Sequence, residues 1–507
     1  MLGILVGFKV SSSMKSNPAN ADLVSDAAEQ RLLLEEEASN QIASSKSADT
    51  GPISAQPPKW QLVIEKAAPI HFNHIRNAFQ NLGFVETNDT NDDWKLLWSF
   101  RDPFYAHHPS FETIKAMKPG QKINQLPGSG WFTYKWYLSE VNPKLDCLPL
   151  TFQLPKNYEA FVKFAKEHEG QYDWVRKNEG HKGVQVTPLS GLGIKMFRPW
   201  GLVVQATLLR SWDFGIYVAI TSSHPFRAYV YNDIVLRFCP AQYVDPVVDP
   251  ANVNAYVVGD HYTAPWEFPP AKKHLDQGKN YMQALTAVLK EQGHDVEDLI
   301  PQLKVRILEL LLKMQPKLKG VSDGYTHGSS SFFAMYRFDF MLDQQLRPYI
   351  MEVNLSPNLS STRHKPLATL FSNVMRDLLR LIGFGPEGAH RQIEMSPETQ
   401  QKLSAKDLAI ASDDICNACV EMDCSSTQVN CVARCPACRT PAQQQAILET
   451  ISEHVHEGTN WSRIYPIPED IKGQAAAYGK QQAPVGDLNG MLDAWVTAAC
   501  RKDSSWC

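Results

Sequence analysis

Apolar and polar residues alternate with two different periods along residues 59–385. Helical spacing of apolar residues predicts five helices, over residues 71–84, 158–170, 282–293, 298–318 and 367–385. Short segments rich in β-branched residues predict strands over residues 173–177, 183–189, 193–197, 202–209, 214–222, 226–232 and 234–240. Strands mixed with helices in this way indicate an α/β (α+β) body of enzyme size.

Turn signals divide the strand-rich part of the chain. "SSHP" and "ND" separate the three strands predicted between residues 214 and 240, and the Pro- and Asp-rich residues 242–280 predict a loop. Beyond the next helices, "FFAMYRFDFML" and "LRPYIMEVNL" predict a hairpin across "DQQ".

The composition is that of a well-packed globular protein. The chain has 507 residues, enough for two or three domains, and 43% of them are hydrophobic. Its 50 basic and 54 acidic residues leave a net charge of −4, so we do not expect a general nucleic-acid binder.

No apolar run reaches the roughly 18 residues of a membrane span. The start, "MLGILVGFKV", has no basic residue before its apolar stretch and is a poor signal peptide. We expect a disordered N-terminus, with the end of a longer signal or anchor segment as the alternative.

Two acids and an amide interrupt the apolar pattern of the predicted hairpin. Strand alternation turns Asp339 away from its apolar neighbours and puts Glu352 and Asn354 on one shared face. A tight turn near Gln344 would bring the three side chains together. Such oxygens are hard ligands suited to Mg²⁺, which commonly bridges substrate phosphates. The alternative is an exposed sheet face with ordinary polar residues.

The hairpin also carries a resemblance to a known family. "YRFDFMLDQQLRPYIMEVNLSPNLSS" resembles the signature of the tubulin tyrosine ligase-like family, in which an FD-(V/F)-(L/M)-(L/V)-D strand precedes a P-(W/Y)-(L/I)-(L/I)-EVN-x-(S/A)-P strand. Four further segments resemble blocks of that family in the same order: "KLLWSFRDPF", "QKINQLPGSGWFTYKWYL", "LPLTFQLPKNYEAF" and "YVAITSSHPFRAYVYNDIVLRFCPAQY". The resemblance covers roughly residues 90–385.

The resemblance implies an ATP-grasp-like fold and an ATP-dependent ligase. Members of the family join an amino acid, usually glutamate, glycine or tyrosine, to a protein carboxylate, typically on a tubulin tail. ATP phosphorylates that carboxylate, and the amine of the free amino acid then attacks the acyl phosphate. The implied cofactors are therefore ATP and Mg²⁺. The implied partners are a tubulin C-terminal tail or another acidic protein acceptor, and a free amino acid, with glutamate expected.

The resemblance also assigns site residues by position. Asp339, Glu352 and Asn354 correspond to the family's Mg²⁺ ligands. Those implied to bind ATP are Lys177, Lys182, Gly183 and Gln205. Asp213 and Arg237 correspond to an acid and a phosphate-side cation of the central strands, and they are the implied catalytic residues. Outside such an alignment, a lone Lys or Arg is more commonly a solvated surface charge.

Several positions depart from the family's pattern. Gln185 stands where the phosphate loop has its second glycine, Ser211 and Gly215 take the Lys and Arg places of K-F-D-(L/V)-R, and Ala264 replaces an Asn. Each lost charge-assisted contact is worth roughly 1.5–3 kcal/mol. Three functions therefore stay open. They are a divergent active ligase, a nucleotide-binding pseudoenzyme that binds a partner, and a ligase for a non-tubulin acceptor, which includes one in the secretory pathway.

These assignments divide the chain into four predicted parts. A disordered N-terminal segment (1–58) precedes the N-terminal α/β part of the ligase domain (59–170). The ATP-grasp part that binds nucleotide and metal (171–385) and a Cys-rich, mainly helical C-terminal extension (386–507) follow.

The cysteines gather in that extension, whereas Cys147 and Cys239 stand alone and are expected to be buried thiols. Six cysteines in "CNACVEMDCSSTQVNCVARCPAC" are nearly mirror-symmetric about "SSTQVN". This symmetry predicts a helical hairpin with three disulfides, and a fourth would join the two last cysteines: Cys416–Cys438, Cys419–Cys435, Cys424–Cys431 and Cys500–Cys507. Zinc binding by the CxxC pairs, with His454 and His456 nearby, and free thiols are the alternatives.

The cysteines bear on the location of the protein. Disulfides persist in oxidising compartments, and Asn88 and Asn460 begin glycosylation sequons. Both features would fit the lumen of the secretory pathway. The family resemblance instead implies the cytoplasm and cytoskeleton, which we take as the expected location with the lumen as its rival.

Overall fold

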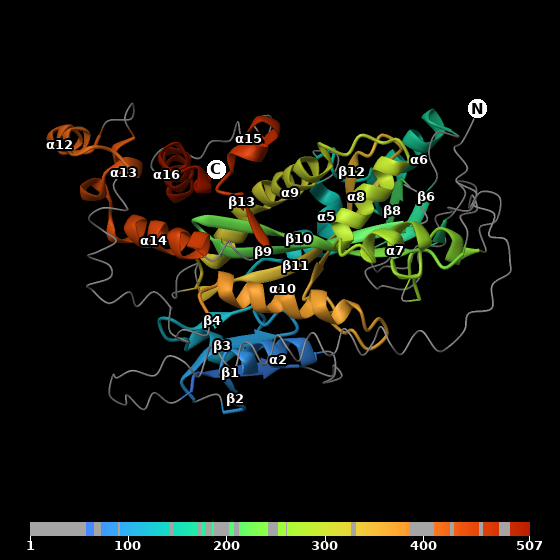
Figure 1. Ribbon diagram of the computed structural model, residues 1–507, viewed down its shortest axis with the longest axis horizontal. Coiled ribbons are helices and arrows are strands. Elements are labelled where there is room, and N and C mark those ends of the chain that lie inside the picture. Colours follow the sequence, from blue (N-terminus) through green and yellow to red (C-terminus); the bar gives the residue numbers. More distant parts are fainter. Residues whose placement is uncertain are drawn as a thin grey trace. The chain divides into compact units, whose positions relative to one another are not determined.

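A computed structural model of the chain describes residues within one compact unit, Pro57–Cys507 (Figure 1). The described residues are 57–64, 72–89, 92–141, 145–169, 174–177, 185–186, 202–206, 212–241, 252–259, 261–325, 331–384, 410–425, 430–455, 460–475 and 487–507. The strand predicted over residues 193–197 lies outside these ranges, as does most of the segment 1–58.

A five-stranded antiparallel sheet forms the centre of this unit, with the strand order β12-β11-β9-β10-β13. Its strands are β9 (Trp212–Ser223), β10 (Phe226–Phe238), β11 (Ala334–Leu342), β12 (Pro348–Leu355) and β13 (Trp461–Tyr465). Strands β11 and β12 form the hairpin predicted across "DQQ". Strand β13 comes from the C-terminal extension and pairs with β10, so the extension completes this sheet.

Two long helices cover the two faces of the central sheet (Figure 1). They are α9 (Leu299–Ser322) and α10 (Leu367–Leu381). Alternation along β9 sends Phe214, Ile216 and Val218 into the cluster with α9, and Tyr217 and Ala219 into the cluster with α10. Because both faces are covered, β9 is apolar on both sides, and its few polar residues lie near its ends.

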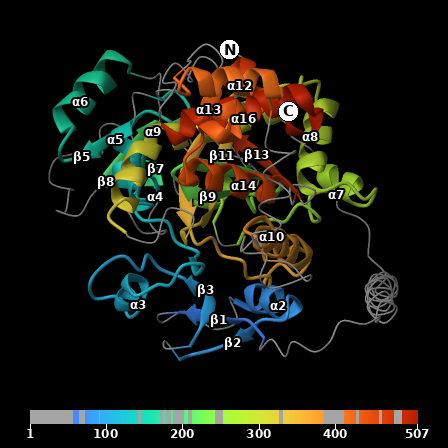
Figure 2. The same cartoon turned by 90° about the vertical axis from the view of Figure 1, so that its left-hand side faces the viewer.

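A parallel sheet with the order β2-β1-β3-β4 packs beside α10 through helix α2 (Figure 2). Its elements are β1 (Lys59–Val63), α2 (Asn73–Asn81), β2 (Val85–Glu86), β3 (Trp94–Ser99), α3 (Phe111–Lys115) and β4 (Lys122–Ile123). Trp60 and Phe79 stack with 4.0 Å between ring centroids and fix α2 against β1. Ile123 bridges to Phe332, which ties this sheet to the start of β11.

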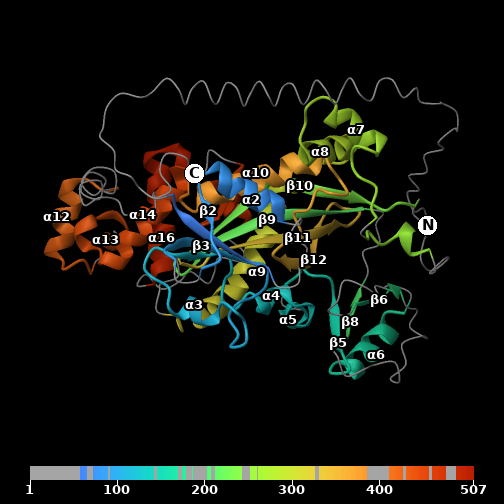
Figure 3. The same cartoon turned by 90° about the horizontal axis from the view of Figure 1, so that it is seen from below.

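A third sheet has the order β5-β8-β6-β7 and lies against helix α6 (Figure 3). Its elements are β5 (Thr151–Leu154), α6 (Tyr158–Glu167), β6 (Trp174–Lys177), β7 (Gln185–Val186) and β8 (Leu202–Ala206). Phe161 of α6 meets Trp174 edge-on with ring centroids 4.9 Å apart. This sheet carries two of the predicted ATP-binding positions, Lys177 and Gln205.

Two predictions between the strands and helices are wrong. The "ND" of residues 232–233 is no turn, because β10 runs through it with only a shift in its pairing with β9. The loop predicted over residues 242–280 contains η5 (Val253–Ala255) and α7 (Pro269–Leu275). Proline at the start of α7 is compatible with a first helical turn, since that position needs no backbone N–H. Helix α8 (Tyr281–Glu291) follows and begins with a capping box between Asn280 and Gln283.

The C-terminal extension is mainly helical, as predicted. Its elements are α12 (Asp413–Glu421), α13 (Cys431–Arg434), η7 (Pro436–Cys438), α14 (Pro441–Val455), α15 (Glu469–Ala475), α16 (Leu488–Lys502) and η8 (Ser504–Trp506). Helix α14 packs on α16 around Ile447, Leu492 and Trp495. The chain before α12, residues 385–409, lies outside the described residues.

Three of the four predicted disulfides have the wrong partners. The structure pairs Cys416–Cys435, Cys419–Cys431, Cys424–Cys438 and Cys500–Cys507, rather than forming zinc sites or free thiols. Mirror pairing assumed two straight helices, but α13 lasts only four residues and gives way to extended backbone at Cys435. The last cysteine of the six is thereby displaced and meets Cys424, whose positive φ of 58° follows the end of α12. Cys147 and Cys239 are buried thiols as predicted.

The mixed α/β (α+β) class and the helical Cys-rich extension are confirmed. Of the described helices, none combines the length and the apolar character that crossing a bilayer requires. The four-part division of the chain stays a proposal, and the pairing of β13 with β10 shows that the extension and the central sheet share one hydrogen-bonded layer.

Candidate functional site

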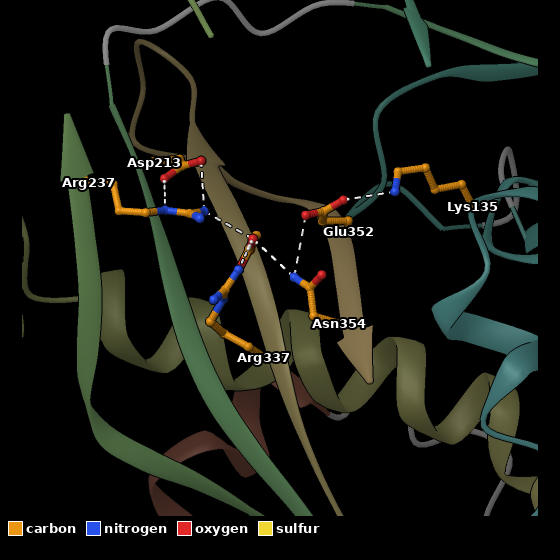
Figure 4. A network of polar contacts seen from close by, with 7 residues as sticks. Lys135, Asp213, Arg237, Arg337, Glu352 and Asn354 are labelled. Carbon is orange, nitrogen blue, oxygen red and sulfur yellow. Dashed lines mark hydrogen bonds and ion pairs between the residues drawn. The ribbon is translucent and has the colours of Figure 1, made fainter. Parts of the chain in front are cut away.

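The predicted metal ligands come together on one face of the β11–β12 hairpin. Asp339 is the direct cross-strand partner of Glu352, and Arg337 is the partner of Asn354. Directly opposed residues in an antiparallel pair share a face, so all four side chains project to the same side. The amide nitrogen of Asn354 donates to Asp339 Oδ2 (3.1 Å) and lies 3.4 Å from Glu352 Oε1. The amide therefore bridges the two carboxylates (Figure 4).

Two guanidinium groups surround Asp339. Arg337 donates from Nε to Oδ1 (2.7 Å) and from Nη2 to Oδ2 (2.9 Å). Arg237 donates from Nη2 to Oδ2 (3.0 Å). Asp339 is only 3% exposed, and burial alone would raise its pKa, but the two arginines hold the pKa of this carboxyl well below its usual range. Asp339 is thus ionised at any physiological pH.

The implied catalytic residues Asp213 and Arg237 form a bidentate pair between neighbouring strands. Arg237 donates from Nε to Oδ1 (2.7 Å) and from Nη2 to Oδ2 (2.9 Å) of Asp213. The register pairs these two residues directly across β9 and β10. Burial raises the pKa of Asp213 to about 6, against the opposing effect of Arg237, so the carboxylate is ionised at pH 7. Arg237 consequently links two carboxylates, those of Asp213 and Asp339 (Figure 4).

Lys135 contributes a further cation from outside the central sheet. Its Nζ lies 3.1 Å from Glu352 Oε2. Lys135 begins α5 (Lys135–Val141), directly after α4 (Gly130–Thr133). The loop before these helices is fixed by Gly128, which has a φ of 85°, and by the bond of 2.7 Å between Ser129 Oγ and the Tyr336 hydroxyl on β11. A turn that requires glycine thus delivers this ammonium to the hairpin.

Lys177, at the end of β6, lies within electrostatic range of the same group of charges. Burial lowers the pKa of Lys177 to about 8, while Glu352 raises it and Lys135 lowers it further. Asp213 and Asp339 also act on it electrostatically. The third sheet therefore places near the hairpin carboxylates an ammonium whose pKa of about 8 lies close to neutral pH.

The remaining implied ATP-binding residues are only partly accounted for. Lys182, Gly183 and Ser211 lie outside the described residues. Gln205 lies on β8, where its backbone pairs with Val175 of β6, two pairs along from the pair of Lys177 with Val203. Their roles stay predictions.

Two of the departures from the family pattern are visible in the structure. At Gly215, an added Cβ would lie 2.5 Å from Cδ of Arg337, so that side chain occupies the space beside the glycine. Ala264 is 0% exposed, and its backbone N–H donates to Glu267 Oε2 (3.0 Å). Thr263 next to it exchanges two backbone hydrogen bonds with Phe238, the neighbour of Arg237.

The donor set suits a divalent cation that arrives together with phosphate. Within the described ranges, no three side chains of His, Cys, Asp or Glu form a group that could hold a metal ion alone. The site has more cations than carboxylates. The carboxylates are Asp213, Asp339 and Glu352, and the cations are Lys135, Lys177, Arg237 and Arg337. One net positive charge remains, which disfavours a bare cation and favours a polyanion such as a nucleotide with its metal.

Sequence reasoning did not single out two members of this site, Lys135 and Arg337. Lys135 is the second lysine of the segment "QKINQLPGSGWFTYKWYL", whose resemblance to the family block assigns no role to single residues. Arg337 lies two residues before Asp339, so strand alternation alone puts it on the same face. What alternation cannot show is that the guanidinium turns back onto the carboxylate.

Comparisons with known proteins agree with the resemblance. A profile described as "Tubulin-tyrosine ligase family" matches residues 113–392, a range that contains every site residue named above. The "Probable tubulin polyglutamylase ttll-15" of Caenorhabditis elegans is 28% identical over 458 residues, which make up 87% of this chain and 85% of that protein.

Two longer relatives match through a smaller part of their length. The "Tubulin monoglutamylase TTLL4" of Homo sapiens is 26% identical over 325 residues, 58% of this chain and 25% of that protein. The "Tubulin polyglutamylase TTLL6" of Mus musculus is 26% identical over 356 residues, 64% of this chain and 41% of that protein. This chain therefore spans less than half the length of TTLL4 and TTLL6.

Proposed function

The chain belongs to the tubulin-tyrosine ligase family, and from this premise we propose that it is an ATP-dependent ligase that adds glutamate to a protein carboxylate. The observation that carries the proposal is that Asp339, Glu352 and Asn354 share one face of the central sheet with Arg237 and Arg337, and that Lys135 and Lys177 add positive charge from neighbouring elements. Relatives named as glutamylases of tubulin support glutamate as the amino acid and a tubulin tail as the acceptor.

The charged side chains of the site have different roles in binding. Lys177 and Arg237 supply positive charge for phosphate oxygens, and Lys135 holds Glu352 in place from the opposite side. Asp339, Glu352 and Asn354 are the residues that would hold Mg²⁺. When bound, that ion neutralises phosphate charge during transfer.

The chemistry consists of two displacements. An oxygen of the acceptor carboxylate attacks the terminal phosphorus of ATP, the bond to the bridging oxygen breaks, and ADP leaves. The amine of glutamate then attacks the acyl carbon, phosphate leaves, and the nitrogen loses a proton as the amide forms. The residues of this chain act by positioning the reactants and by stabilising charge that develops on oxygen, which together supply most of the rate enhancement in such reactions.

The test is nucleotide binding and glutamate incorporation by the wild type and by Glu352→Gln. The substitution keeps the shape but removes one anionic ligand and the partner of Lys135, so we expect incorporation to fall by about ten- to a hundredfold. Glu291→Gln is the matched control, because Glu291 is 46% exposed and its partners Lys273 and His274 are not among the site residues. A Glu352→Gln protein that folds normally and keeps full incorporation would remove the proposed site.

Two outcomes of the same assay point to the other functions. ATP binding without any glutamate-dependent turnover would identify a nucleotide-binding pseudoenzyme. Incorporation into other acidic proteins but not into tubulin would identify a different acceptor.

A non-tubulin acceptor has two structural observations in its favour. The extension contains four disulfides, and the sequon residues Asn88 and Asn460 are exposed. Disulfides are typical of oxidising compartments, whereas tubulin-modifying relatives suggest a cytoplasmic or cytoskeletal location. A secretory-pathway acceptor is therefore the second candidate, and comparing tubulin with a panel of acidic lumenal proteins as acceptors decides between the two.

A further inference from the structure

Gly215 on β9 makes room for a side chain from the neighbouring strand. Residue 215 lies directly opposite Asp339 on β11 and Val235 on β10. A Cβ at this position would lie 2.5 Å from Cδ and 2.8 Å from Nε of Arg337. Atoms do not approach so closely, and these are inner atoms of the side chain rather than its mobile end. Only glycine therefore allows Arg337 to lie across β9 here.

The guanidinium reached through this gap occupies the oxygens that a metal would need. Both of its hydrogen bonds go to Asp339, one to each carboxylate oxygen. Arg237 differs, because it is anchored by two bonds to Asp213 and adds only one to Asp339. The side chain of Arg337 is 14% exposed, so it is not sealed in the core.

We infer that Arg337 is a positioning and anion-binding residue. It neutralises Asp339 when no metal is bound and presents its N–H donors to an oxyanion of the substrates once Asp339 holds the metal. The family pattern has its arginine at position 215, and this chain supplies a guanidinium at the same place from the adjacent strand. The inference rests on the proposed function, since it assumes that the site takes a nucleotide with its metal.

Two oxyanions are candidates, the terminal phosphate of ATP and the carboxylate of the acceptor, and both would be bound by the same bidentate chemistry. A purely structural ion pair is the competing explanation. The two explanations predict opposite changes in the affinity for a metal ion when Arg337 is removed. A counter-ion competes with a metal for Asp339, so its removal strengthens metal binding, whereas loss of a structural support weakens the binding of every ligand.

The experiment compares the full-length wild type with Arg337→Gln. Mn²⁺ alone serves as the metal probe, and we expect its affinity to rise by about tenfold or more, because a unit positive charge beside the ligand is removed. If the oxyanion is the terminal phosphate, the affinity for ATP falls by about tenfold while that for ADP changes less. If it is the acceptor carboxylate, the ratio of ATP to ADP affinity is unchanged and the KM for the acceptor rises.

The matched control is Arg347→Gln. Arg347 lies in the turn of the same hairpin, is 54% exposed and stands 4.0 Å from Asp343, so its removal should alter none of these quantities. Unchanged or weakened Mn²⁺ binding in Arg337→Gln would overturn the inference. An Arg337→Gln variant with wild-type ATP selectivity and a wild-type KM for the acceptor would do so as well.

A second pair of variants keeps the test decisive if Arg337→Gln folds poorly. Gly215→Arg alone should destabilise the protein, because its Cβ meets Arg337. Gly215→Arg combined with Arg337→Ala removes that clash and returns the guanidinium to β9. Stability should therefore recover together with the ATP selectivity or the acceptor binding, whichever Arg337→Gln had changed. A double variant as defective as the sum of its single variants would contradict the inference. The metal, nucleotide and stability measurements need no ligation, and for a wild type that incorporates no glutamate the Kd of the acceptor replaces its KM. Such a wild type would count against the proposed function alone.

Discussion

Two arginine–carboxylate networks lie on the same face of β9 and β10, at opposite ends of the strands. At one end, Asp213 and Arg237 join Asp339 in the candidate site. At the other end, Arg227 donates from Nε to Glu453 (3.0 Å) and from Nη2 to Glu449 (2.8 Å), both on α14. Between them, Tyr217, Ala219 and Tyr229 belong to the apolar cluster against α10.

The two networks differ in solvent exposure and in net charge. Arg227 is 1% exposed, and Glu453 also accepts hydrogen bonds from Tyr229 (2.7 Å) and Thr221 (3.0 Å). Lys122 is the second cation acting on Glu449 and Glu453, so this network is electrically balanced. The candidate site instead keeps an excess cation, and the side chain of Glu352 remains 25% exposed. A balanced and covered network holds the extension on the sheet, whereas an open and cationic one is suited to bind an anion.

The largest expected effect is on the covered network. Arg227→Met leaves Glu449 and Glu453 buried with much of their compensation removed, so we expect the free energy of unfolding to fall by about 3–5 kcal/mol. Lys272→Met is the control, because the pair Lys272–Asp276 is 52% and 60% exposed and should contribute less than about 1 kcal/mol. Denaturant unfolding of both variants measures the difference. Equal effects would show that the covered network does not anchor the extension.

The next effect concerns the disulfides of the extension. Replacing Cys419 and Cys431 by Ser opens a bridge with a sequence separation of 12 residues, which we expect to cost about 2–3 kcal/mol of local stability. The bridge Cys500–Cys507 spans only 7 residues at the chain end, so its removal should cost less. Limited proteolysis of the extension and ATP affinity are measured together. If the affinity for ATP fell together with the resistance of the extension to proteolysis, the candidate site would depend on the extension, and the two networks would not be independent.

The smallest effect is the pH dependence of the candidate site. Because the pKa of Lys177 is about 8, its ammonium is charged below that pH and becomes neutral as the pH rises through it. The affinity for ATP should therefore be constant from pH 6.5 to about 7.5 and fall by about tenfold by pH 9. Lys177→Arg stays charged over this range and should abolish the decline. The same decline in Lys177→Arg would assign the titration to another group.

Local patterns were sufficient for the parts of the fold in which each residue's neighbours lie close in sequence. Strand alternation and a short turn were enough to predict the hairpin and the shared face of Asp339 and Glu352. The helices α2, α6, α8, α9 and α10 followed from apolar spacing. The same local reasoning failed at "ND", because β10 pairs with β9 on both sides of a bulge at these residues and the N–H of Asn232 donates to the carbonyl of Asn460, although their own propensity favours a turn.

Features that depend on contacts between distant segments were decided by the tertiary structure. The six clustered cysteines showed that disulfides were to be expected, but the early end of α13 selected the partners. Likewise, the sequence contained both Gly215 and Arg337, yet only the pairing of β9 with β11 places the side chain of Arg337 in the space beside Gly215. The physical reason is that secondary structure follows from interactions a few residues apart, whereas a charge network depends on which strands become neighbours.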